Sequence, residues 1–254
     1  MSATKRIRNV FTLALVALTV SSASAQLSCQ IGILDLTANG GINPATGNPW
    51  KAGDKYRFIF TSSGVTPATS TDINDYNTFV QNLANASPLK IGAAQRVTWK
   101  VIASTATVAA RDNTSTYIEV NGTGEAIFLL DGKTVVATDY ADLWGSESHN
   151  NVINKTELLT TPPSVKTYGD TWTGTYRYNY PDANYGTKDT PGGGGGPLGD
   201  TDGTAMCGLW PFTSGTHWIW RWGNTTDTGL PIYALSDPLT VQAPHTTGTV
   251  IVVR

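Results

Sequence analysis

One amphipathic helical segment, flanked by short strand-like runs, limits what this chain can fold into. Apolar side chains recur at helical spacing and share one face, made of Ile73, Tyr76, Val80, Leu83 and Ala84. Thr71 precedes this run as the expected N-cap, and Pro88 ends it because proline disfavours helical geometry in the preceding residue. β-Branched and aromatic runs at 56–60 and 96–103 have the length of strands. This pattern predicts a strand–helix–strand core.

The rest of the chain carries strand and turn signals. The runs 126–130 and 133–136 are separated by Asp131-Gly132, which predicts a β-hairpin with a type I′ turn. Short helices are expected over 105–110, after Ser104, and after Asp139; short strands are expected at 31–34, 172–176 and 230–235. No linker separates two cores. We therefore expect a single α+β domain over 26–254, with an extended loop region near 145–230.

The first 25 residues have the features of a secretory signal peptide. Lys5, Arg6 and Arg8 precede an apolar run from Val10 to Val20, and Ala23-Ser24-Ala25 forms a small-residue cleavage site. We expect cleavage after Ala25 and a secreted protein, at the cell surface, in the periplasm or outside the cell, with no integral membrane segment in the mature chain.

The net charge of the mature chain limits the classes of partner that it can bind. Loss of the three basic residues of the leader changes the formal charge from −2 to −5, and no Lys/Arg cluster is present. This excess of negative charge argues against nucleic acid and against an anionic membrane surface as binding partners.

Cys29 and Cys207 are the two cysteines, and in an oxidising compartment they are candidates for a disulfide.

No pattern predicts a catalytic residue. His149, His217 and His245 fall in separate segments, and no Gly-x-Ser-x-Gly elbow is present. Asp200 and Asp202 alternate before a glycine, as at the start of a calcium loop, and Asp189 lies nearby. The terminal glutamate of such a loop is missing. A solvated loop is therefore the favoured interpretation, with a calcium site as the alternative.

Tryptophans gather near the C-terminal third of the chain, at Trp210, Trp218, Trp220 and Trp222. The last three alternate, so on a strand they would share one face and could stack on sugar rings. The favoured interpretation is instead that they pack beneath the long loop, because an exposed stripe would form a large apolar patch.

Several segments carry a resemblance: 35–47, Trp50, 52–57, 68–73, 97–105, 110–113, 141–144 and 233–236. They are similar to a group of uncharacterised bacterial exported proteins, many of which carry a C-terminal PEP-CTERM sorting tail. The residues up to Arg254 contain no such tail, so the resemblance does not imply tail-dependent sorting. The order of parts also resembles the endostatin-like, C-type-lectin-like fold, which implies a mixed sheet with one main helix, short helices and long loops. The Glu-Pro-Asn and Trp-Asn-Asp motifs of calcium-dependent lectins are absent, so lectin activity does not carry over.

Three functions follow from these observations. The favoured hypothesis is a non-catalytic binding or cell-surface protein for a glycan or an extracellular protein. The first alternative is a secreted hydrolase acting on polysaccharide, with a pair of Asp or Glu residues from 139–202 in one cleft. The second is a structural matrix protein.

Overall fold

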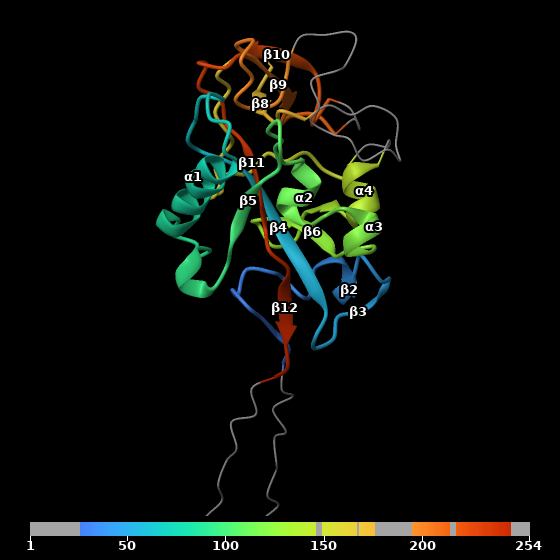
Figure 1. Cartoon of the computed structure of the whole chain (residues 1–254). Coiled ribbons are helices and arrows are strands. Elements are labelled where there is room, and N and C mark those ends of the chain that lie inside the picture. The colour runs from blue at the N-terminus through green and yellow to red at the C-terminus, as the bar shows by residue number, and fades with distance from the viewer. Residues whose placement is uncertain (1–25, 146–148, 167, 176–194, 214–216, 245–254) are drawn as a thin grey trace, which may run out of the picture.

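A mixed β-sheet runs through the centre of the computed structural model, which describes residues 26–145, 149–166, 168–175, 195–213 and 217–244 (Figure 1). The strands of this sheet are β1 (Ser28–Cys29), β4 (Lys55–Thr61), β5 (Trp99–Val101), β6 (Ala126–Leu129), β7 (Val135–Ala137), β11 (Tyr233–Ser236) and β12 (Leu239–Gln242). Neighbouring strands are hydrogen-bonded in the order β1-β12-β4-β11-β5. Outside this path, β6 pairs with β4, and β7 pairs with β6. The α+β prediction is confirmed.

The helices cover the two faces of this sheet. They are α1 (Ile73–Ala86), α2 (Ala110–Thr114), α3 (Ile118–Asn121) and α4 (Tyr140–Trp144). Figure 1 shows α1 on one side of the sheet and the short helices on the other. Two 3-10 turns, Ala38–Gly41 and Ala93–Gln95, and a two-stranded ribbon of β2 (Ile42–Asn43) and β3 (Asn48–Pro49) complete this part of the chain.

Strand β4 divides the core in two because successive side chains on a strand point to opposite faces. Tyr56, Phe58 and Phe60 belong to the same hydrophobic cluster as the apolar face of α1, whereas Ile59 belongs to the cluster that contains the apolar residues of α4. β4 is also the one parallel partner of β6 and an antiparallel partner of β11 and β12. The strand–helix–strand unit therefore forms the centre of the molecule.

The buried face of α1 agrees with the prediction, but its cap lies one residue later. Ile73, Tyr76, Val80 and Ala84 are buried, and Leu83 is half-buried. The N-cap is Asp72 rather than Thr71, since the Asp72 carboxylate accepts a hydrogen bond of 2.9 Å from the backbone N–H of Asn74. Aspartate caps at least as well as threonine.

The hairpin prediction is confirmed, whereas the predicted type I′ turn is wrong. β6 and β7 pair antiparallel, but only Gly132 of the two turn residues has a positive φ, of 76°. Asp131 keeps a negative φ and instead accepts bonds from the N–H groups of Lys133 (3.1 Å) and Thr134 (2.9 Å). Its side chain thus closes a longer loop.

Other predicted boundaries shift. The expected helix over 105–110 begins at Ala110, although Ser104 Oγ accepts from the Ala110 N–H at 2.9 Å. The first strand lies at 28–29 and not at 31–34. Asp139 caps α4 as predicted, accepting from the Asp142 N–H at 2.7 Å. The leader and residues 245–254 lie outside the described residues.

A second, three-stranded sheet stands at the end of the molecule opposite the β1–β12 pair (Figure 1). It has the order β10-β9-β8, from β8 (Asp170–Trp172), β9 (Thr204–Leu209) and β10 (Trp222–Thr225). The backbone N–H of Trp172 donates to Pro231 O at 2.8 Å, which joins this sheet to the segment before β11. The part of the chain described here contains no helix long and apolar enough to cross a membrane.

Candidate ligand-binding site

A pocket of about 240 Å³ opens on the three-stranded sheet and is lined mainly by aromatic residues. We call it the aromatic pocket, and its lining consists of Tyr168, Leu209, Phe212, His217, Arg221 and Trp222. The ring centroids of Tyr168 and Trp222 lie 5.5 Å apart, and those of Phe212 and His217 lie 5.7 Å apart in a stacked arrangement. Tyr168 is 56% exposed and Phe212 is 40% exposed, so both rings are accessible to a ligand.

Trp222 is fixed in orientation by the residues behind it. Its indole N–H donates to Asp170 Oδ2 at 3.0 Å, and the Asn224 amide donates to the same oxygen at 2.7 Å. Asp170 is buried. On the open side, the guanidinium of Arg221 lies 5.1 Å from the Trp222 ring centroid, a cation–π contact. The pocket therefore presents a preorganised ring and an exposed cation.

Cys207 lies beneath the same strand pair but cannot act as a nucleophile in its resting state. Its thiol donates to Trp222 O at 3.1 Å, and the Asn224 amide donates to the sulfur at 3.1 Å. Burial, and next the negative charge of Asp170, raise the pKa of the Cys207 thiol to about 12. The thiolate is the reactive form, so at neutral pH this buried thiol is protonated and inert.

The disulfide for which Cys29 and Cys207 were candidates is not formed in the structure, where both thiols are free. Cys29 belongs to β1 of the central sheet and Cys207 to β9 of the small sheet. The Cys29 thiol donates to Leu34 O at 3.1 Å, and burial raises its pKa. The two thiols thus have separate partners.

The stripe of tryptophans on one strand face, which was the less favoured interpretation, does not form. Trp222 is on β10, but Trp218 lies in a turn before the strand and Trp220 in an irregular segment. Trp218 is buried, with its ring centroid 4.4 Å from His149 and 5.7 Å from Tyr233. Its face is therefore unavailable to a sugar.

Trp210 and Trp220 are half-buried against the same hydrophobic cluster as Trp218. Packing beneath the loops thus describes these three rings, and Trp222 alone of the four lines the aromatic pocket.

The described residues provide no set of ligands for the calcium site that the sequence left as an alternative. Asp200 and Asp202 lie in a turn in which the Asp202 N–H donates to Asp200 Oδ1 at 3.3 Å. Among the described residues, no group of three or more His, Cys, Asp or Glu side chains could hold a metal ion. Asp189 and His245 lie outside the described residues.

The described carboxylates between 139 and 202 have hydrogen-bond partners in different parts of the fold. Asp139 caps α4, and Asp142 Oδ2 accepts from the Thr138 N–H at 2.7 Å. Glu157 Oε2 accepts from the Ser63 N–H at 3.0 Å, whereas Asp170 holds Trp222. The aromatic pocket contains no Asp or Glu in its lining. It therefore lacks the paired carboxylates that glycoside hydrolysis requires.

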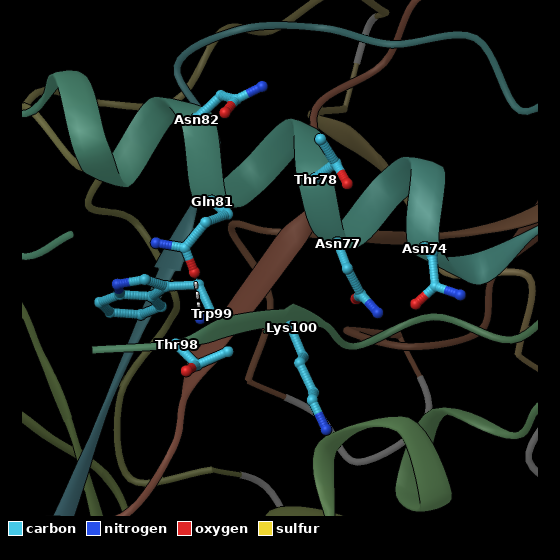
Figure 2. A pocket seen from close by; sticks show the side chains of 8 residues that line it. All are labelled: Asn74, Asn77, Thr78, Gln81, Asn82, Thr98, Trp99 and Lys100. Carbon is cyan, nitrogen blue, oxygen red and sulfur yellow. Dashed lines mark hydrogen bonds between the residues drawn. The ribbon is translucent and has the colours of Figure 1, made fainter. Parts of the chain in front are cut away.

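A second pocket, of about 280 Å³, lies between α1 and β5. We call it the amide groove, and it is lined by Asn74, Asn77, Thr78, Gln81, Asn82, Thr98, Trp99 and Lys100. Figure 2 shows Gln81 turned from α1 towards Trp99, with Lys100 extending from the strand away from the helix. No aromatic face is open here, because Trp99 is buried and its indole N–H donates to Ile91 O at 2.7 Å.

Two amides of α1 cap the outer edge of β5. Gln81 Oε1 accepts from the Trp99 N–H at 2.9 Å, and its amide donates to Val97 O at 3.3 Å. Asn77 Oδ1 accepts from the Val101 N–H at 2.9 Å. These side chains replace the missing neighbouring strand.

Most residues of both pockets were not predicted from the sequence. Tyr168, Phe212 and Arg221 carry no distinctive spacing, because they come from separate loops that only the fold brings together. The amide side chains of the second pocket, in contrast, could have been recognised in the sequence. Asn74, Asn77 and Gln81 recur at helical spacing on the polar side of a segment already assigned as a helix.

No family model matches this chain, and neither the curated proteins nor the solved structures include a match.

Proposed function

We propose that this protein is an exported, non-catalytic binding module whose aromatic pocket takes a glycan. The observation that carries the proposal is the Tyr168–Trp222 ring pair in a concave pocket beside the exposed Arg221. Aromatic faces stack on the apolar C–H faces of sugar rings, and a guanidinium donates to hydroxyl or carboxylate oxygens. Because Asp170 already holds the Trp222 ring, little conformational entropy is lost on binding.

Two further expectations belong to this proposal. Export rests on the leader-like residues 1–25. The C-type-lectin-like arrangement rests on the order of strands, helices and loops along the chain. The proposed binding needs no calcium, since its contacts are rings, an imidazole and a guanidinium.

A glycan array followed by tryptophan-fluorescence titration of the positive sugars tests the proposal. Tyr168→Ala removes an exposed ring, and loss of one stacking contact weakens binding roughly two- to tenfold. The matched control is Val120→Ala, which shortens an exposed side chain on α3, outside the pocket. Affinity that is unchanged in Tyr168→Ala and Phe212→Ala, or no sugar bound with or without calcium, would contradict the proposal.

A further inference from the structure

The amide groove shares no lining residue with the aromatic pocket, and its floor is already rigid. Asn77 and Gln81 are one helical turn apart, a rise of about 6 Å, which matches the roughly 6.6 Å between alternate residues of a strand. Asn77 is further locked by Asn113, whose amide donates to Asn77 Oδ1 at 2.9 Å and to Val101 O at 2.8 Å. A ligand would therefore meet a floor that does not have to reorganise.

The rim of the groove, in contrast, holds polar groups that the fold does not use. The side chains of Thr78, Asn82, Thr98 and Lys100 make no hydrogen bond or ion pair with other described residues. The Asn74 amide donates to Asp72 Oδ1 at 3.1 Å, which leaves its carbonyl oxygen available. Lys100 is the one charged residue of the lining, and it has no carboxylate beside it there.

This chemistry selects a particular kind of ligand. Amides and hydroxyls each donate and accept hydrogen bonds, as sugar hydroxyls do, whereas the Lys100 ammonium only donates and favours an anion. We propose that the amide groove is a second ligand site, for a small hydroxyl-rich molecule that carries one carboxylate, of the uronic acid class. Recognition there is by hydrogen bonds and one charge, without ring stacking.

Titration of the isotope-labelled chain with D-glucuronate and D-glucose, followed by NMR, tests the assignment. We expect glucuronate to shift the side-chain amide signals of Asn74 and Asn82, with an affinity at least about tenfold above that of glucose. Lys100→Gln should reduce glucuronate binding to the glucose level, and Lys100→Arg should keep the preference. The matched control is Lys51→Gln, which removes an exposed lysine from the loop before β4.

Three outcomes would overturn the proposal. The first is the absence of shifts in the groove at tens of millimolar of either sugar, which would leave the amides only their strand-capping role. The second is an equal loss of binding in Lys100→Gln and Lys51→Gln. The third is a glucuronate response confined to the Trp222 indole signal, which would support the aromatic pocket and contradict the groove.

Discussion

At the scale of single residues, the hairpin tip at Asp131-Gly132 depends on backbone space as well as on turn chemistry. Gly132 O accepts from the Asp35 N–H at 2.9 Å, and a Cβ on Gly132 would lie 2.0 Å from Ile33 O. The tip is thus pressed against the N-terminal segment, a contact that the Asp-Gly pattern alone does not indicate.

We predict that Gly132→Ala lowers the free energy of unfolding by more than about 2 kcal/mol. The positive φ alone costs roughly 1 kcal/mol, and the contact with the Ile33 backbone oxygen adds displacement of the N-terminal segment. Gly122→Ala is the control, since Gly122 also has a positive φ but has nothing within 4 Å of the added Cβ. Urea unfolding of both variants measures the difference, and equal losses would contradict the steric explanation.

Asp131 should make stability depend on pH in the acid range. Burial opposes ionisation, but hydrogen bonds from Thr134 and Lys133 outweigh it and lower the pKa of Asp131 below its usual 3.8. A carboxylate with a lowered folded-state pKa contributes stability that is complete above the unfolded-state pKa and lost as pH falls through the folded value.

Thermal unfolding between pH 6 and 2.5 would show this loss below about pH 4. Asp131→Asn should be less stable than the parent at pH 6 and should lose less on acidification. A pH profile of the same steepness in both proteins would argue against this role for Asp131.

At the scale of elements, α1 both fills one half of the core and protects a sheet edge. Its apolar face meets Phe60 and Trp99, while Gln81 and Asn77 satisfy backbone groups of β5 that no strand pairs. An unprotected edge strand invites pairing with another chain. One helix therefore packs the core through its apolar face and caps the edge of β5 through Asn77 and Gln81.

Gln81→Leu tests the edge-capping role. It leaves the Trp99 N–H and Val97 O without their protein partners, which we expect to cost about 1–3 kcal/mol in unfolding free energy. We also expect concentration-dependent association in sedimentation experiments. The control Asn82→Leu changes the adjacent exposed amide, which bonds to no described residue. Similar behaviour of the two variants would exclude a capping role.

At the scale of the whole molecule, the described residues are held together without a disulfide. Two hydrophobic clusters share the central sheet, and a buried Arg57 connects this sheet to the short helices by donating to Ser236 O (2.6 Å), Tyr140 Oη (3.0 Å) and Thr114 O (2.8 Å). These bonds join β4 to β11, α4 and α2. Packing and such buried polar contacts thus connect segments far apart in the chain.

Both cysteines should be titratable thiols. We expect a thiol reagent to label Cys29 and Cys207 slowly in the native protein and fully in denaturant, because burial raises both pKa values and limits access. A reducing agent should leave the melting temperature unchanged. Recovery of an intramolecular disulfide by mass spectrometry of non-reduced peptides would contradict the structure.

What sequence reasoning recovers here is what depends on local periodicity. The apolar face of α1, the Asp139 cap, the two runs of the hairpin and the α+β class follow from side-chain spacing that neighbouring residues set by themselves. The exact N-cap was wrong because the adjacent Thr71 and Asp72 side chains compete for the same backbone donors. The turn type was wrong because the Asp131 carboxylate accepts from the backbone N–H groups of Lys133 and Thr134. The leader-like segment is a compositional prediction of the same local kind.

The tertiary structure alone decided which groups meet. Trp218 is buried in the core and Trp210 and Trp220 pack against it, since burial of large apolar surface outweighs any strand periodicity. Tyr168, Phe212 and Arg221 join Trp222 from separate loops, and Lys100 joins amides of α1 from another element. The strand–helix–strand segment, which the sequence predicts, is thus the scaffold of the fold, and the polar side of its helix lines a candidate site. Which residues complete the two pockets could not be predicted, because spacing along the chain does not encode distance in space.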